Sequence, residues 1–556
     1  MKKFSKPKHK TTDEAEDLAK SRVKNFMQGN SYEVSPVETL KMVAGSSVFG
    51  EPSYYQPSHV KQRYLDSLLP YGLSFDLDDF ENTTEVFNRV IDLALSYDFK
   101  ATLDLAVELR HHYFMRLNPN IILVKACMHR KRVAFTNEFG PYLRQIGGKI
   151  ILRPDDVVAQ LDLYLFLNGS KKGLPNVLKR IWQDRLSSFS RYQLNKYKSN
   201  LLIDAARISH ANNELIDELL TTGTIEVSDQ EKTWENLRSE GYTWPQILEA
   251  TYVPHMALLR NLRNIFKQEK RQPEDHTDSS TENESAIDTN QKGIDLDFTQ
   301  SVLTQLSEGV TKGKQFPFRY YTAYTQIHKA EVHHKEHILS ALEKCIDTAI
   351  YNFPDLRGKS ICLCDNSGSA WGAIPSSYGS VTVAIIANLS ALITAIRSEE
   401  GEVGVFGDNL TTIPVLQDES ILSQLDKINQ IGKKQGMSTE NGIWLFFDKA
   451  IKNKAWYDHI FIYSGMQAGY GNLFGKDSSQ YKDYSVNGNY IDVLSLIMAY
   501  RKEVNPKVNV FSVQVAGYKN TAVPENHYRT SILSGWTGNE VTYAKYINDI
   551  WDQADI

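Results

Sequence analysis

The chain has 556 residues, of which 41% are hydrophobic and 23% charged, a globular composition with ample material for a core. Four cysteines exclude a disulfide scaffold and favour a reducing compartment, and the net charge of −5 argues on its own against nucleic-acid binding. The longest apolar stretch, 381–396, is interrupted by polar residues and is too short to cross a bilayer. We therefore expect a cytoplasmic protein without membrane attachment.

The first part of the chain is predicted to be helical. Residues 1–30 are polar and charged, and we expect them to form a flexible tail. In 31–357 apolar residues recur at helical spacing, as in 101–110 and 120–128, whereas strand-like alternation is nearly absent. This density of helices predicts an α-solenoid of HEAT-like repeats, although no strict sequence repeat accompanies it.

Charge is distributed unevenly within this helical region. Residues 110–207 contain 18 Lys and Arg but 6 Asp and Glu, a net of +12, which leaves −17 for the rest of the chain. Aromatic residues are interleaved with the basic ones. Such a surface can hold phosphates by charge and stack exposed bases, so it indicates a polyanionic partner. The alternative is a set of solvated helix faces with the aromatic residues in the core.

A polar, acidic segment at about 267–297 interrupts the helical pattern. It is rich in Asp, Glu, Ser and Thr and poor in apolar residues. Because such a composition buries too little apolar surface to offset the entropy of ordering the chain, we predict a disordered insertion there.

Beyond residue 357 the pattern changes to alternating strands and helices. Short apolar runs predict strands at 360–364, 403–406, 412–415, 459–463 and 508–515. Helical spacing predicts helices at 375–397, 440–450, 490–501 and 540–551. This alternation is typical of a doubly wound, Rossmann-like α/β domain, which we assign to residues 358–556.

The first predicted strand of this domain runs into Asp365-Asn366-Ser367-Gly368-Ser369, a D-x-S-x-S motif. Open α/β sheets bind their ligands at the carboxyl ends of strands. Asp365, Ser367 and Ser369 would point the same way and offer hard oxygen ligands, which suit Mg²⁺ or another divalent cation. The alternative is that the serine hydroxyls only cap the next helix.

The motif and the sheet that follows it resemble a von Willebrand factor A domain with a metal-ion-dependent adhesion site. The resemblance implies a ligand set of Asp365, Ser367, Ser369 and Thr439, the last lying just before a predicted helix. The family commonly adds an Asp at the end of its fourth strand, where this chain has Gly465. We therefore expect a divalent-cation site weakened by the loss of one carboxylate.

Several short segments together resemble the Ro ribonucleoprotein family, in which a TROVE module of helical repeats precedes an A domain. They lie at 36–46, 195–198, 207–210, 256–262 and 316–319. Their order and spacing extend over nearly the whole chain. The resemblance implies that residues 31–357 close into a ring and that the A domain at 358–556 helps to close it.

The same resemblance implies RNA contacts at seven positions: Lys179, Arg180, Lys196, Lys198, Arg207, His210 and Arg260. The family has an arginine soon after the second lysine of its basic helix, where this chain has Ser199 and Asn200, so one phosphate contact is expected to be weaker. Arg260 has an alternative role in an ion pair between helices.

As function, the resemblance implies binding of Y RNA or Y-like RNA on a basic outer surface. It also implies capture of the single-stranded 3′ ends of misfolded RNA in the ring hole, for quality control or degradation, with an exoribonuclease as a partner in bacteria. The sequence contains no H-E-x-x-H, Walker or G-x-S-x-G motif, and we expect no catalysis. The alternative function is a metal-dependent protein-interaction scaffold that uses the A domain.

Overall fold

The computed structural model describes residues 22–24, 30–32, 35–45, 83–112, 115–131, 136–226, 232–268, 294–372, 381–437, 442–465, 485–486, 490–491, 493–515, 522–523, 527–534 and 540–554. The described part forms two compact units. The first comprises Met1–Ile225, Pro354–Asp418 and Ser423–Ile556, and the second Glu226–Phe353 with Glu419–Leu422. Among the described residues, no helix combines the length and apolarity needed to span a membrane.

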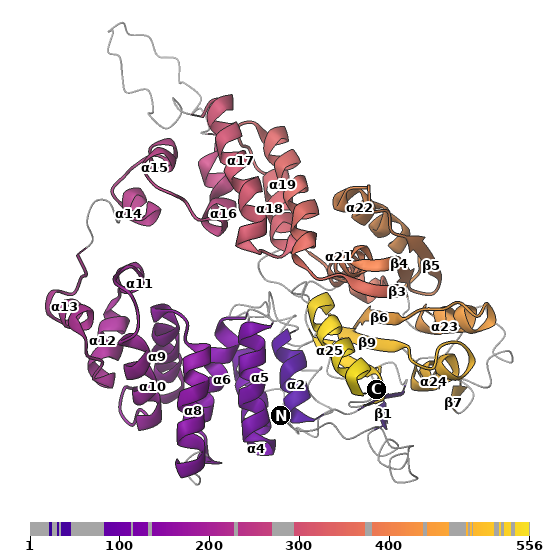
Figure 1. Ribbon diagram of the computed structural model, residues 1–556, viewed down its shortest axis with the longest axis horizontal. Coiled ribbons are helices and arrows are strands. Elements are labelled where there is room, and N and C mark those ends of the chain that lie inside the picture. The colour runs from indigo at the N-terminus through magenta and orange to yellow at the C-terminus, as the bar shows by residue number, and fades with distance from the viewer. Residues whose placement is uncertain are drawn as a thin grey trace, which may run out of the picture. The chain divides into compact units, whose positions relative to one another are not determined.

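The first unit begins with the predicted run of paired helices (Figure 1). They are α2 (Pro36–Gly45), α4 (Thr83–Tyr97), α5 (Phe99–His111), α6 (Leu117–Met128), α8 (Thr136–Ile150), α9 (Pro154–Asn168), α10 (Asn176–Leu186), α11 (Arg191–Lys196), α12 (Asn200–Ser209) and α13 (Glu214–Thr222). Helices adjacent in sequence and next-but-one neighbours pack together, as in α5 with α6 and α10 with α12. This stacking confirms the predicted helical repeats. At the end of the predicted tail, β1 (Arg22–Lys24) pairs antiparallel with β2 (Asn30–Tyr32), which extends beyond it.

Local signals in the sequence set the ends of these helices. Asp98 accepts a hydrogen bond from the Ala101 N–H at 2.9 Å and so caps α5. Pro154 occupies the first turn of α9, and Gly169 ends that helix with a φ of +70°. Caps of this kind let each short helix stop where the next one must turn back.

A buried polar network joins four of these helices. Arg110 on α5 donates to Asp156 on α9 at 2.8 Å, and Asn120 on α6 donates to the same carboxylate at 3.1 Å. Gln160 then links Asn120 to the indole N–H of Trp182 on α10, with both hydrogen bonds at 2.7 Å. Part of the positive charge in 110–207 is therefore structural.

The second unit is a helical bundle (Figure 1). Its elements are α14 (Trp234–Ser239), α15 (Trp244–Ala250), α16 (His255–Ile265), α17 (Leu296–Gly313), α18 (Pro317–Lys329), α19 (Lys335–Ala349) and the 3-10 turn η4 (Ile350–Asn352). His255 packs where Gly309 and Gly313 leave room on α17, and its ring lies 2.6 Å from the Tyr320 hydroxyl. The core of the predicted acidic insertion, 269–293, lies outside the described residues. Its flanks are ordered, because Lys267 bridges to Val332 and residues 296–297 begin α17.

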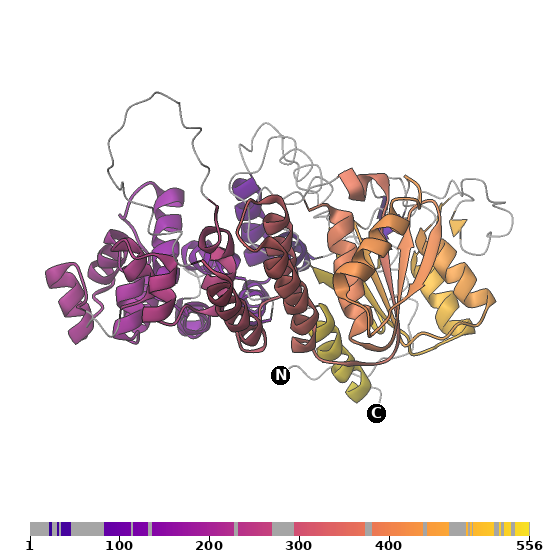
Figure 2. The same cartoon turned by 90° about the horizontal axis from the view of Figure 1, so that it is seen from above.

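The α/β domain has a six-stranded sheet in the order β10-β9-β6-β3-β4-β5, with helices on both faces (Figure 2). The strands are β3 (Leu356–Asp365), β4 (Ser398–Phe406), β5 (Leu410–Pro414), β6 (His459–Ser464), β9 (Asn509–Gln514) and β10 (Thr530–Ser534). Neighbouring strands are parallel except β4 and β5. The helices are α20 (Gly368–Gly372), α21 (Val383–Ile396), α22 (Ile421–Gly432), α23 (Gly442–Lys452), α24 (Val493–Glu503) and α25 (Glu540–Ala554). The predicted doubly wound domain is confirmed.

The structure adds elements that the sequence pattern did not predict. Strand β10 and helix α22 were not anticipated, and the start of the helix predicted at 490–501 is instead β8 (Tyr490–Ile491), paired with β7 (Ser485–Val486). In the sheet, Cys362 and Cys364 are both buried, and as alternate residues of β3 they lie on the same face of the strand.

Within the first unit, the N-terminal helices join the α/β domain through a buried cluster. Lys41 on α2 lies 3.0 Å from the Glu108 carboxylate on α5 and 2.9 Å from the Tyr543 hydroxyl on α25. Burial raises the pKa of Glu108, but the Lys41 ammonium outweighs it and holds that pKa below its ordinary value. Burial raises the pKa of Tyr543 to about 12. The cluster ties α2 to the last helix.

Candidate nucleic-acid interface and metal site

Many basic residues of the region 110–207 are neutralised by carboxylates within the helices. Arg144 pairs with Asp184 at 2.7 Å, and Lys171, which precedes α10, pairs with Asp204 on α12. Further pairs are Arg110–Asp156, Arg116–Asp155, Lys125–Asp92, Arg153–Asp155 and Arg191–Glu218. The excess positive charge on the surface is therefore carried by fewer side chains than the sequence count suggested.

Four of the predicted RNA-contacting cations stay without an acidic partner among the described residues. They are Lys179, Arg180, Lys198 and Arg207. Arg180, Lys198 and Arg207 are exposed, and Lys179 is half-buried. Unpaired, solvated cations can exchange water and counterions for RNA phosphates at little desolvation cost, so these side chains suit such contacts.

The structure gathers one group of predicted residues at the C-terminal end of α12. Helices α10 and α12 lie side by side (Figure 1). The Gln183 side-chain amide donates to the His210 carbonyl at 3.0 Å. Lys179 lies one turn before Gln183, and Arg207 one turn before His210. His210 ends α12 with a φ of +56° and is exposed. Lys179, Arg180, Arg207 and His210 therefore lie on, or at the end of, two helices that pack together.

Lys196 and Lys198 lie at the opposite end of α12, about 15 Å away at 1.5 Å per helical residue. The Lys196 ammonium is held by two tyrosines. It lies 5.6 Å from the ring centroid of Tyr192, 5.9 Å from that of Tyr197 and 3.4 Å from the Tyr192 hydroxyl. Lys198 is exposed and has no acidic partner among the described residues. The two ends of α12 thus present separate basic groups.

Arg260 lies on α16 in the second unit, away in the chain from the other six predicted residues. It is exposed and forms no ion pair with any described residue. The alternative role of Arg260, an ion pair between helices, is therefore absent among the residues that the structure describes.

The interleaved aromatic residues divide into two kinds. Trp182 and Phe189 belong to the helical core, as the alternative interpretation expected. Tyr192 is 47% exposed and Tyr197 half-buried, so these two rings lie on the basic surface. Arg153 was not among the predicted RNA contacts, yet its guanidinium lies 5.5 Å from the Tyr197 ring centroid. Because Arg153 and Tyr197 lie far apart in the sequence, no local pattern predicted this contact.

The D-x-S-x-S motif lies at the carboxyl end of β3, as predicted. Asp365 is 4% exposed, and its Oδ1 accepts a hydrogen bond from the Ser367 N–H at 2.9 Å. The hydroxyls of Ser367 and Ser369 lie 3.1 Å apart. Three of the four predicted metal ligands are therefore close together. The fourth, Thr439, lies outside the described residues.

The neighbouring strand supplies donors in place of the missing acidic residue. The Ser464 hydroxyl at the end of β6 donates to Asp365 Oδ2 at 3.0 Å, and the Gly465 backbone also hydrogen-bonds to that carboxylate. Ser464 was not predicted. The parallel pairing of β6 with β3 is the signal that could have identified it.

The charge of Asp365 has no cationic side chain beside it among the described residues. Burial raises the pKa of this carboxyl although Ser367, Ser464 and Gly465 donate to it. A buried carboxylate next to two hydroxyls is a fitting donor set for a hard cation that keeps several waters. No group of three or more His, Cys, Asp or Glu residues suited to a metal occurs in the described part of the chain. The single acidic ligand therefore predicts weak binding.

The loop that precedes Thr439 reaches the motif. The Gly368 N–H donates to the Met437 carbonyl at 2.9 Å, and the Met437 N–H donates to Asp408 at 3.0 Å. Asn366 faces inward and shares two hydrogen bonds of 2.8 and 2.9 Å with Asn388 on α21. These hydrogen bonds connect the turn to the loop before Thr439 and to α21.

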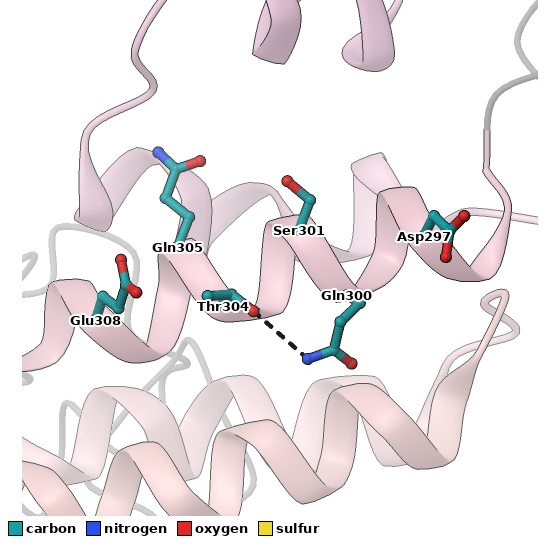
Figure 3. Close-up of a pocket in the computed structure, with 6 residues that line it drawn as sticks. All are labelled: Asp297, Gln300, Ser301, Thr304, Gln305 and Glu308. Atoms are coloured by element: carbon teal, nitrogen blue, oxygen red, sulfur yellow. Dashed lines mark hydrogen bonds between the residues drawn. The ribbon is translucent and has the colours of Figure 1, made fainter.

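A shallow pocket of about 450 Å³ lies along one face of α17 (Figure 3). It is lined by Asp297, Gln300, Ser301, Thr304, Gln305 and Glu308. All six side chains are polar and come from one helix, and none is a predicted site residue. With carboxylates towards both ends, this pocket does not suit RNA phosphates.

The fold and the two sites define a class of protein: helical repeats followed by an α/β domain with a D-x-S-x-S turn. No protein-family model matches the chain, and no curated protein matches its sequence. Its fold is similar to the crystal structure of the Deinococcus radiodurans RO (RSR) protein, with a TM-score of 0.54 and 12% sequence identity. The similarity covers 92% of this chain and 99% of that chain, and so confirms the predicted Ro-type fold across both regions.

Proposed function

We propose that this chain is an RNA-binding protein of the Ro type that holds structured RNA on the basic face of α10, α11 and α12. The observation that carries the proposal is the set of exposed cations without acidic partners on these helices. Its main members are Arg180, Lys198 and Arg207. The fold shared with the Deinococcus radiodurans RO (RSR) protein supports it.

The proposed mode of binding is recognition of the RNA backbone. Cations at both ends of α12 would contact phosphates of one RNA molecule, which gives affinity without reading the base sequence. Duplex RNA presents mainly phosphates and 2′-hydroxyls to such a surface. The protein would act as a binder rather than as an enzyme.

The finer parts of the proposal concern partners. Y RNA or a Y-like RNA would occupy the basic face, and a hole in the ring would take the single-stranded 3′ end of misfolded RNA. The assembly would serve RNA quality control or degradation in the cytoplasm, together with an exoribonuclease.

Binding of a hairpin RNA with and without a single-stranded 3′ tail tests this function. We expect the affinity, measured by fluorescence anisotropy, to fall steeply between about 50 and 200 mM salt. Lys198→Glu combined with Arg207→Glu should weaken binding at least about tenfold. Lys434→Glu with Lys449→Glu, the same charge change on exposed lysines of the α/β domain, should not. A salt-independent affinity would refute phosphate binding.

A second function is favoured by Asp365 and its two hydroxyl neighbours. In this alternative the α/β domain binds an acidic protein ligand through Mg²⁺, and the helices act as a scaffold. Asp365, Ser367 and Ser369 would hold the cation, with Thr439 as the further predicted ligand. When bound, the cation would supply positive charge for a carboxylate of the ligand. Mg²⁺-dependent capture of an acidic peptide, lost in Asp365→Ala, would support it.

A further inference from the structure

The basic face carries one strongly exposed aromatic ring, that of Tyr192 on α11. We propose that Tyr192 is a stacking platform for one unpaired nucleobase of a bound RNA. This inference rests on the proposed RNA-binding function and makes it more specific: the preferred ligand is an RNA with an unpaired nucleotide beside its duplex.

Lys196 holds the Tyr192 ring in place. The two residues lie one turn apart on α11, a spacing that brings their side chains together. The ammonium sits 5.6 Å from the ring centroid and 3.4 Å from the phenol oxygen. Because these contacts restrict the ring, stacking a base on it should cost little further side-chain entropy.

The second surface tyrosine is already engaged. The Arg153 guanidinium lies 5.5 Å from the Tyr197 ring centroid, and Arg153 is itself anchored by Asp155 at 3.2 Å. Lys196 lies 5.9 Å from the same ring. Tyr197 therefore contacts two cations, while Tyr192 has the larger exposed area.

The surroundings of Tyr192 match a nucleotide, which has a flat base joined to a phosphate. Lys198, exposed and without an acidic partner, lies just beyond the end of α11 and can meet the phosphate. The ion pair of Arg191 with Glu218 on α13, at 3.0 Å, fixes the other end of this short helix. Among the described residues, no lysine lies over the exposed ring of Tyr97 on α4 as Lys196 lies over that of Tyr192.

Stacking selects for unpaired nucleotides. Inside an A-form duplex both faces of a base are covered by its neighbours, so a protein ring can stack only on a base in a loop, a bulge or an end. Every base has a π face, and such a contact tolerates any base identity. The basic face would thus distinguish irregular from fully paired RNA.

The test uses two hairpin RNAs that differ by one unpaired 2-aminopurine nucleotide in the stem. Tyr192→Leu should bind the RNA with the unpaired nucleotide about tenfold more weakly than wild type, and the fully paired RNA within about twofold. Tyr192→Phe should keep the preference. Tyr97→Leu is the matched control, because that ring is 63% exposed and lies outside the basic face. Wild type should also quench 2-aminopurine fluorescence, and Tyr192→Leu should not.

Equal losses for both RNAs, or no loss for either, would overturn the stacking role of Tyr192. If wild type binds both RNAs with a steep salt dependence while Tyr192→Leu behaves like wild type, only this inference fails. If wild type binds neither RNA, the proposed function fails with it. Unchanged thermal unfolding of Tyr192→Leu would show that its effect does not come from misfolding.

Discussion

The basic face of α10 to α12 and the Asp365 end of the sheet use charge in opposite ways. On the basic face several cations are solvated, unpaired and spread over both ends of a helix. At the sheet edge one carboxylate is buried, and hydrogen bonds from Ser367 and Ser464 fix both of its oxygens. Exposed charges contribute to binding in proportion to their number and are screened by salt. The effect of a buried charge depends on the geometry of the groups around it. The two sites should therefore respond differently to mutation.

The largest effect should come from a charge that is buried within the helical repeats. Asp156→Ala leaves Arg110 buried without its partner and should lower the free energy of unfolding by about 3–5 kcal/mol. Asp184→Ala removes the exposed pair with Arg144 and should cost less than about 1 kcal/mol. Urea unfolding of both variants measures the difference. Similar values would break the distinction between buried and exposed charge.

The next largest effect should come from the cluster of Lys41, Glu108 and Tyr543, which joins the N-terminal helices to the α/β domain. Glu108→Gln should cost about 1.5–3 kcal/mol at pH 7, because Lys41 and Tyr543 lose a charged partner. Since the pKa of Glu108 is lowered in the folded state, its stabilisation is present above the ordinary value of 4.5 and is lost as the pH falls through the lowered value. Urea unfolding from pH 7 to pH 3 should show the two proteins converging in acid. A constant gap would contradict this assignment.

Removal of divalent cations should have a smaller effect, at the sheet edge. At ten times its dissociation constant, Mg²⁺ should stabilise the wild type by about 1.4 kcal/mol. Asp365→Ala and the more conservative Asp365→Asn should lose this response, while Asp418→Ala, an exposed acid of the same domain, should keep it. The shift of the thermal unfolding midpoint between Mg²⁺ and EDTA measures this stabilisation. A response preserved in both Asp365 variants would place the cation elsewhere.

The smallest effect should come from one residue of the basic face. Arg207→Ala should weaken RNA binding only a few-fold, equally for RNAs of different sequence, and reduce the salt slope by about 1. Anisotropy titrations at several salt concentrations measure both quantities, with Lys449→Ala as the unchanged control. A loss that depended on base sequence would make Arg207 a reader of bases and would weaken the contrast between the two sites.

The sequence predicted the architecture well where the signal was local. Apolar runs located β3, β6 and β9, and the D-x-S-x-S turn lies where the end of β3 predicted. Strand β10 was missed because its five residues, Thr530–Ser534, are partly polar and become a strand only by pairing with β9.

The candidate sites could be predicted only in part, because their environment is assembled from distant segments. Asp204 neutralises Lys171 and Ser464 donates to Asp365, and neither pairing has a signature in the local sequence. Burial likewise separates Trp182 from Tyr192, although both are aromatic residues in the same basic stretch. Which charges and rings reach solvent is decided by packing, not by residue type.

The contact between Lys41 and Tyr543 has a consequence for how the protein is made, since 502 positions separate the two residues in the chain. At a synthesis rate of about 5–20 residues per second, α2 emerges roughly 25–100 s before its partner on α25 exists. During that interval the Lys41 side of α2 stays open to solvent and to other chains. We expect the first unit to reach its native state only once α25 has been synthesised, and α2 to need protection by chaperones until then.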